Sequence, residues 1–297
     1  MEVWKMNDYQ NAIEINGLTK HYDGFTLDNL SFHVTRGEIM GFIGQNGAGK
    51  TTTMKALLNI IKPDSGSMKI LGMDTAKEAP AIKERIAVLF DELPFHDEFN
   101  AGNLEVILGD IWQDWNNEIF RQYLERFSLP RKKKIGHFSK GMKMKLQIAC
   151  ALSHNAQLLI MDEATTGLDP VVRNEILDIL LEYIQDENHT VFMSSHITTD
   201  LEKIADSVTF IDRGKLLLTG HKDDILANHG IIKCSKSDYK EIAPGDIVSA
   251  RITDFGAEVM VSDKAFCRGK YKGLVMDDAT LEEIMLFYVN SPKKEWR

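Results

Sequence analysis

The stretch from Gly44 to Thr51, with the sequence GQNGAGKT, restricts most strongly what this chain can fold into. It matches the pattern G-x-x-x-x-G-K-[ST], follows the apolar run Ile39–Ile43 and opens a helical pattern. Glycines allow successive backbone N–H groups to turn inward around a phosphate, and the N-terminus of the helix adds a partial positive charge. The pattern therefore predicts a phosphate-binding loop between a buried strand and a helix.

Two side chains of this loop are suited to a nucleotide that carries magnesium. The Lys50 ammonium is expected to neutralise the β- and γ-phosphates, and the Thr51 hydroxyl to ligate Mg²⁺. We therefore predict ATP and Mg²⁺ as the bound groups. The predicted nucleotide-binding residues here are Gly44, Gln45, Asn46, Gly47, Ala48, Gly49, Lys50, Thr51 and Thr52.

A second candidate for chemistry is the apolar run Leu158–Met161, which is followed by Asp162 and Glu163. A buried strand that ends there places Asp162 where it can hold the magnesium shell, and Glu163 where it can polarise an attacking water. Alone, such a run also fits an exposed pair of loop carboxylates. Its position downstream of Lys50, in the same strand-helix pattern, favours the catalytic interpretation.

Short apolar runs of strand type alternate with helical patterns along most of the chain, which predicts an α/β fold with a mainly parallel sheet and helices on both sides. The early part, through Val34, is instead typical of an antiparallel hairpin. The expected strands are Ala12–Ile15, Leu30–Val34, Ile39–Ile43, Ser67–Leu71, Ile86–Phe90, Leu158–Met161, Val191–Ser194, Val208–Ile211 and Lys215–Leu218. The expected helices are Thr51–Ile61, Val106–Trp112, Glu118–Phe127, Gly141–Ser153 and Val171–Gln185.

Two changes in this pattern suggest how the chain is organised. No strand pattern occurs at about 100–151, which predicts a helical insertion that splits the sheet domain. Beyond Gly220, short alternating segments and a final helix near Thr280–Val289 predict a small α+β appendage. We therefore expect a nucleotide-binding domain at 10–220 and a C-terminal accessory region at 221–297.

Charge and cysteine content exclude some partners. The formal net charge is −9, which makes the chain a poor binder of phosphate backbones, so we expect no nucleic acid partner. Three widely separated cysteines, without a C-x-x-C pair, argue against a zinc site or a disulfide framework and fit a reducing cytoplasm. No apolar run approaches the roughly 20 residues of a membrane span, and the first residues lack the pattern of a secretory signal.

With both nucleotide motifs identified, residues at about 10–220 resemble the nucleotide-binding domain of ATP-binding-cassette (ABC) transporters. Between the two motifs lies Phe138–Met142 (FSKGM), at the place of the family signature Leu-Ser-Gly-Gly-Gln. Ser139 and Gly141 match, whereas Lys140 and Met142 depart from it. The resemblance implies that this segment caps the γ-phosphate bound to the opposite subunit, without the hydrogen bond that the signature glutamine would make. Locally, an ordinary helix start with Ser139 as its N-cap fits equally well.

Other family elements match single residues. Asp169, in the sequence Gly-Leu-Asp, resembles the D-loop that crosses the dimer interface, and His196 resembles the switch histidine that contacts the γ-phosphate. Tyr22 resembles the aromatic residue that stacks on adenine, although a tyrosine in a turn is often a packing residue. Asp91 stands where the family commonly has glutamine, and its carboxylate is expected to bind magnesium through water.

The resemblance implies an ATPase, with Glu163 and His196 as its catalytic residues. It would power transport by a separate membrane permease, through ATP-driven pairing with a second ABC cassette as a homodimer or a heterodimer. The expected location is peripheral, at the cytoplasmic face of the cell membrane. The sequences FSKGM, LPRKKK (129–134) and TLEEI (280–284) resemble bacterial exporters of drugs, antibiotics or antimicrobial peptides.

Alternatives remain open. The chain resembles, less closely, the ATPase of an importer or of a lipid or polysaccharide exporter, and more distantly a non-transport ABC ATPase or a nucleotide-sensing scaffold. A single phosphate-loop motif disfavours the translation-factor type, which carries two cassettes. The absence of a heptad tract disfavours the chromosome-maintenance type. Nothing in the sequence identifies the cargo.

Overall fold

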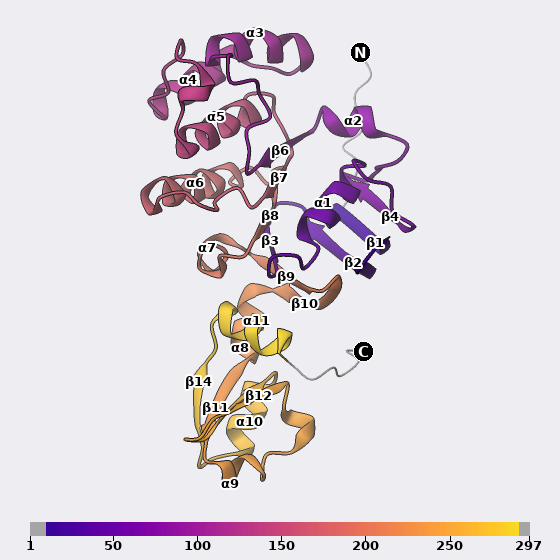
Figure 1. Cartoon of the computed structure of the whole chain (residues 1–297), viewed down its shortest axis with the longest axis vertical. Helices are drawn as coiled ribbons and strands as arrows, with labels where there is room; N and C mark the ends of the chain where they lie inside the picture. Colours follow the sequence, from indigo (N-terminus) through magenta and orange to yellow (C-terminus); the bar gives the residue numbers. More distant parts are fainter. Residues whose placement is uncertain (1–9, 291–297) are drawn as a thin grey trace.

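The computed structural model describes residues 10–290. The expectations that concern the first residues of the chain and positions 291–297 of the accessory region lie outside the described residues. Within the described part, a central sheet, an antiparallel sheet beside it and a smaller C-terminal sheet follow one another along the long axis of the molecule (Figure 1).

The central sheet has six strands in the order β10-β9-β3-β8-β7-β6. Neighbouring strands are parallel except for β10, which is antiparallel to β9. This confirms the mainly parallel sheet that the alternating pattern predicted. The strands are β3 (Ile39–Ile43), β6 (Ile86–Phe90), β7 (Leu158–Asp162), β8 (Thr190–Ser195), β9 (Ser207–Asp212) and β10 (Lys215–His221).

Both faces of the central sheet are covered, because successive side chains of a strand point to opposite faces. In β3, Ile39 and Ile43 belong to a core formed with the helices on one face. Phe42 belongs to a second core on the other face, where its ring lies 5.3 Å from Phe32 and 5.5 Å from Phe192. A strand buried on both sides explains why this run has no polar position before the phosphate loop.

The second core lies against an antiparallel sheet of order β2-β1-β4-β5. Its strands β1 and β2 form the hairpin that the early sequence predicted, joined by a tight turn in which Gly24 has a φ of 77°. Glycine suits this turn because positive φ carries no steric cost without a Cβ atom. The strands are β1 (Asn11–Tyr22), β2 (Phe25–Thr35), β4 (Ser65–Ile70) and β5 (Met73–Asp74).

Between β6 and β7, a stretch that is fully described, the chain forms helices and no strand. This is the predicted helical insertion, made of α3 (Ala101–Ile111), α4 (Asn117–Arg126), a 3₁₀ turn (Ile135–His137) and α5 (Lys140–Leu152). The other helices of this part of the chain are α1 (Lys50–Leu57), α2 (Ala79–Lys83), α6 (Pro170–Tyr183), α7 (Thr198–Ile204) and α8 (Lys222–Asn228).

Helix α1 is shorter than the sequence predicted. It was expected to reach Ile61 but ends at Leu57, and Asn59 has a φ of 55°. Asparagine is among the few residues that adopt the left-handed conformation readily, because its short polar side chain bonds locally. The helical periodicity therefore continues in the sequence beyond the point where the backbone turns.

The C-terminal part folds in the order β-α-β-β-α-β, with an antiparallel sheet of strand order β12-β13-β11-β14. This is the split βαβ arrangement of ferredoxin-like folds. The expected α+β appendage is thus present, with two strands and two helices more than the sequence indicated. Its elements are β11 (Gly230–Cys234), α9 (Lys236–Tyr239), β12 (Ser249–Ile252), β13 (Ala257–Val261), α10 (Lys264–Lys270) and β14 (Val275–Asp278).

The last helix, α11 (Leu281–Val289), connects this sheet to the rest of the chain. Its buried residues, Ile284 and Phe287 among them, belong to the same core as the helical face of the central sheet. At its start, the Leu281 N–H donates to Glu202 of α7 at 2.7 Å. Near its end, the Tyr288 hydroxyl lies 2.8 Å from Nε2 of the buried His229. In Figure 1, α11 accordingly lies between the C-terminal sheet and the central part of the molecule.

Candidate nucleotide-binding site

The phosphate loop, residues 44–51, connects β3 to α1 in the predicted way. Gly47 and Gly49 have φ values of 79° and 114°, a region that side chains rarely allow. A Cβ atom on Gly49 would lie 2.6 Å from Leu27 Cδ2, and one on Gly44 would lie 2.4 Å from the Ile211 carbonyl oxygen. The glycines are therefore needed both for the turn and for close packing.

The N-terminus of α1 is built to receive an anion. Its N-cap residue is Gly49, which has no side chain to accept a hydrogen bond from the first-turn N–H groups. The first helical turn contains no acidic residue. Unpartnered N–H groups and the helix dipole together favour a phosphate at this point.

Lys50 is held at the mouth of this loop with only 5% of its surface exposed. Its Nζ donates to the Gly44 carbonyl at 2.6 Å and lies 3.0 Å from Glu163 Oε1. The loop thus bends back onto its own lysine, and the ammonium faces the end of β7. Lys50 and Glu163, which are far apart in the sequence, meet as the two motifs predicted.

Four side chains converge at this place, and we call Lys50, Glu163, Thr166 and His196 the catalytic cluster. The Thr166 hydroxyl donates to Glu163 Oε2 at 2.8 Å, and His196 Nδ1 lies 2.6 Å from the same oxygen. Burial raises the pKa of the Glu163 carboxyl, but the hydrogen bonds from Lys50 and Thr166 lower it more, so the pKa lies below its ordinary value. Glu163 is therefore an ionised acceptor at neutral pH.

Asp162 ends β7 and is oriented by the neighbouring strand. In the register of β7 and β8, Asp162 lies opposite Ser194, whose hydroxyl donates to Asp162 Oδ1 at 2.6 Å. The same hydroxyl accepts the Glu163 N–H at 3.0 Å. Ser194 thus fixes both acidic residues, a role that the sequence pattern did not reveal although Ser194 lies in a predicted strand.

The segment FSKGM begins α5. Ser139 is its N-cap, and the Ser139 hydroxyl accepts the Met142 N–H at 3.2 Å. A Cβ atom on Gly141 would lie 3.2 Å from Val172 of α6, so the glycine lets the two helices approach closely. Asp169 caps α6 and accepts the N–H groups of Val171 and Val172. In the single chain, Ser139 and Asp169 serve as caps at neighbouring helix N-termini.

Asp91 follows β6, but its carboxylate is engaged elsewhere than in the catalytic cluster. Its Oδ1 lies 2.5 Å from Nζ of Lys140 at the start of α5. The preceding residue, Phe90, exchanges two backbone hydrogen bonds with the Gln147 side chain of α5, at 3.0 and 3.2 Å. The segment after β6 is therefore tied to α5. The sequence alone did not identify Gln147 as a positioning residue.

Tyr22 ends β1 and pairs across the hairpin with Phe25, and 46% of its surface is exposed. Phe25 in turn borders the phosphate loop, because a Cβ atom on Gly49 would lie 3.0 Å from Phe25 Cζ. The Tyr22 ring is thus one residue away from the loop, with an accessible face. This position suits a ring that stacks on a bound base.

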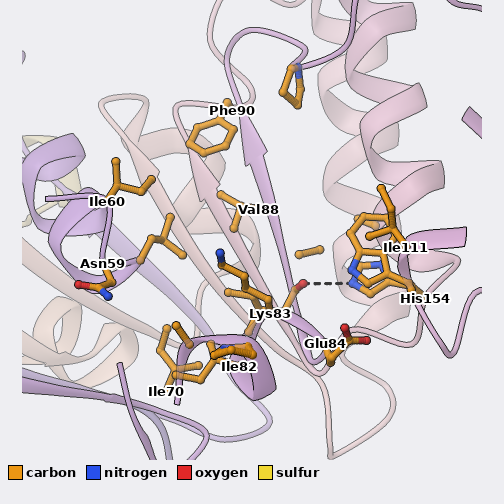
Figure 2. A pocket seen from close by; sticks show the side chains of 18 of the residues that line it. Asn59, Ile60, Ile70, Ile82, Lys83, Glu84, Val88, Phe90, Ile111 and His154 are labelled. Atoms are coloured by element: carbon orange, nitrogen blue, oxygen red, sulfur yellow. Dashed lines mark hydrogen bonds between the residues drawn. The ribbon is translucent and has the colours of Figure 1, made fainter. Parts of the chain in front are cut away.

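A cavity of about 780 Å³ lies between β6, the end of α1 and the helical insertion. Figure 2 shows Ile60 and Phe90 on one side and Ile111 beside His154 on the other. The His154 ring stacks on Trp112 at 4.1 Å, and its Nε2 lies 3.1 Å from the Ile86 carbonyl oxygen. Burial lowers the pKa of His154, so the wall of this interlobe groove is apolar and uncharged there. None of the helices in residues 10–290 has the length and apolar character that a membrane span needs.

Comparisons with known proteins agree with this geometry. The family model described as ABC transporter matches residues 27–166. The bacitracin transport ATP-binding protein BcrA of Bacillus licheniformis is 39% identical over 69% of this chain and 68% of its own length. The doxorubicin resistance ATP-binding protein DrrA of Mycobacterium tuberculosis is 31% identical over 80% of this chain and 72% of its own. A solved structure, the ATP-binding subunit of an ABC transporter, superposes with a TM-score of 0.66 at 27% identity, over 73% of this chain and 92% of that one.

The fold and the site thus define a nucleotide-binding α/β protein in which a phosphate loop faces a strand that ends in Asp-Glu. The chain belongs to the ABC transporter family. It is an ATP-binding ATPase subunit of a transporter, as the sequence predicted, and ABC subunits of this kind dimerise and work with membrane permease components.

Proposed function

We propose that this subunit powers the export of a drug, antibiotic or antimicrobial peptide through a separate membrane permease. The names of similar proteins support export: bacitracin transport for BcrA, and doxorubicin or daunorubicin resistance for two others. Because the similarity to BcrA covers 69% of the chain, it includes the cassette as a whole and not a single motif.

The observation that carries the proposed chemistry is the catalytic cluster. Glu163 is ionised and is within hydrogen-bond distance of His196, so its carboxylate can take a proton from water at the γ-phosphate. Lys50 is the natural counter-charge for the β- and γ-phosphates. In the single chain, Lys50 and Glu163 neutralise each other at 3.0 Å. Nucleotide must therefore separate this pair, which couples occupancy of the loop to release of the catalytic base.

Mg²⁺ fits the residues beside the cluster. Thr51 is exposed at the start of α1, and Asp162 is oriented by Ser194 at the end of β7. Magnesium is usually bound by one or two protein oxygens together with substrate phosphates and water. We propose that Thr51 and Asp162 hold the ion directly and that Asp91 contacts it through water after leaving Lys140. The ion would supply charge neutralisation at the phosphates.

The remaining site residues fit a nucleotide that is shared between two subunits. We propose that Tyr22 stacks on adenine in one subunit, while Ser139, Gly141 and Asp169 of the other approach the γ-phosphate. The caps at α5 and α6 support this role, since they place two helix N-termini beside each other. Each chain then supplies half of two sites.

We propose that the interlobe groove receives the permease, at the cytoplasmic face of the membrane. Exposed apolar side chains of α3, such as Val106 at 65% and Ile111 at 59%, support a protein contact beside this groove. The same proposal divides the chain into a cassette at 10–220 and an accessory region from 221 that packs through α11.

A replacement in the organism of origin tests the direction of transport. Cells that carry Glu163→Gln should become more sensitive to exported compounds, with bacitracin, doxorubicin and a cationic antimicrobial peptide as the panel. A matched strain with Glu175→Gln, a surface residue paired with Lys145, should behave as wild type. Unchanged sensitivity together with loss of uptake of a nutrient would favour the importer alternative instead.

A further inference from the structure

Lys140 occupies a position where the ABC signature has glycine, and its side chain has a defined partner. The Nζ atom lies 2.5 Å from Asp91 Oδ1, and the two side chains are 41% and 48% exposed. Asp91 itself stands where the family has a neutral glutamine. Both departures from the family pattern therefore carry charge, the charges are opposite, and the two residues contact each other.

A lysine is an unusual choice at this point of a helix. Lys140 is the first residue of the 13-residue helix α5, whose first turn contains Lys143 as well and no acidic residue. Cations at a helix N-terminus are unfavourable because the helix dipole is positive there. An anion must offset this charge, and in the single chain Asp91 does so. Because the ion pair is half exposed, solvent screens it and a stronger anion can displace Asp91.

The position of the ammonium shows where that second anion would come from. A Cβ atom on Gly167 would lie 3.2 Å from Lys140 Nζ, so the lysine extends toward the loop that precedes α6. This loop and the start of α5 form the surface that the proposed pairing turns toward the nucleotide of a second subunit. At the same surface, Met142 replaces the signature glutamine and supplies no hydrogen bond.

We propose that Lys140 binds the γ-phosphate of the ATP held by a second copy of the chain, exchanging Asp91 for that phosphate when two copies close. This inference rests on the proposed ATP-driven pairing. Lys140 compensates for the missing glutamine at Met142, and it adds a full positive charge where the γ-phosphate carries most of its negative charge. A charge-assisted hydrogen bond of this kind is about twice as strong as a neutral one.

Pairing of the Glu163→Gln protein, measured by sedimentation with ATP and magnesium, tests the inference. Adding Lys140→Met should raise the dissociation constant of the pair by about 10-fold or more, since this change removes two charge-assisted hydrogen bonds from each closed pair. Lys140→Arg should restore most of the affinity. Lys143→Met is the matched control, because Lys143 lies in the same helical turn with its Nζ 3.5 Å from Asp97 Oδ1, and it should leave pairing unchanged.

The outcomes separate this inference from the proposal on which it rests. If Glu163→Gln alone stays monomeric with ATP, the shared-site proposal fails. If it pairs, and Lys140→Met pairs equally well, only the role of Lys140 is wrong. ATP binding to the dilute monomer supplies the last distinction: we expect it to be the same with and without Lys140→Met. A matching loss in the monomer would show that Lys140 acts in its own site, which contradicts the inference.

Discussion

Glu163 has a φ of 53°, in the left-handed region that residues other than glycine rarely occupy. Such a conformation costs on the order of 1–3 kcal/mol and persists where the surroundings hold it. Here the Glu163 N–H donates to Ser194, and the Glu163 carboxylate is bound by Lys50 and Thr166. The backbone turn thus aims the carboxylate at the phosphate loop before any nucleotide arrives.

The first prediction follows from this placement. Glu163→Gln should leave ATP binding intact and lower kcat by about 10²- to 10⁴-fold, because the carboxylate acts on water in the transition state. ATP affinity and steady-state turnover of the purified protein are the measurements, with Glu175→Gln as control. Near-normal turnover would exclude Glu163 as the general base.

Tyr22 allows a second prediction at the scale of one residue. Tyr22→Ala should weaken ATP binding by about 1–3 kcal/mol, the range for stacking of a base on an aromatic ring, whereas Tyr22→Phe should be nearly silent because the ring is kept. Binding of ATP, measured for the three proteins by calorimetry, decides this. If alanine and phenylalanine variants both bind as wild type does, Tyr22 is a packing residue.

The sequence predicted the residues that carry charge or a motif, and it missed those that position them. Lys50 and Glu163 were predicted because each belongs to a local pattern. Ser194 and Gln147 were missed because their partners, Asp162 and Phe90, lie 32 and 57 positions away. Only the register of β7 against β8, or the packing of α5 against β6, brings such residues together.

At the scale of elements, strands buried on both faces were predicted better than the short strands of the C-terminal sheet. A run such as Ile39–Ile43 is apolar at nearly every position, so its pattern is clear. By contrast, β14 (Val275–Asp278) lies at the edge of its sheet and ends in two aspartates. Its place depends on pairing with β11, which local sequence does not encode.

Helix α11 gives a third prediction. A chain that ends at Gly230 should still fold and bind ATP with wild-type affinity, since the catalytic cluster precedes this point. It should, however, unfold at a lower temperature than the whole protein. The truncation removes α11, whose Ile284 and Phe287 are at most 1% exposed, and uncovers apolar residues of the cassette such as Leu201.

Two comparisons make this measurable. Removal of 291–297 alone keeps α11 and serves as the control for shortening the chain. Phe287→Ala in the full chain should lower the free energy of unfolding by about 3–5 kcal/mol, as for a large buried aromatic residue, without changing ATP affinity. A folded truncated protein that no longer binds ATP would contradict the division at residue 220.

At the scale of the whole molecule, one chain carries each half of a nucleotide site once. The phosphate loop and the catalytic cluster form one group, and the caps at the starts of α5 and α6 form another. The Asp91–Lys140 pair and Gln147 connect the second group to β6, so movement of the insertion relative to the sheet must pass through these contacts. A partner that binds in the interlobe groove lies directly against this connection.

The last prediction concerns assembly. Two copies related by a two-fold axis can close two sites, whereas one copy can close none, so wild-type ATPase rate should rise faster than linearly with protein concentration. ATP with magnesium should shift the Glu163→Gln protein from monomer to pair, because blocked hydrolysis leaves the γ-phosphate in place. ADP should not, since it lacks that phosphate. Sedimentation over a range of concentrations measures the shift, and Lys50→Ala in the Glu163→Gln protein should abolish it through loss of nucleotide. Full activity from a protein that remains monomeric throughout would exclude a shared site and place the whole reaction within a single chain.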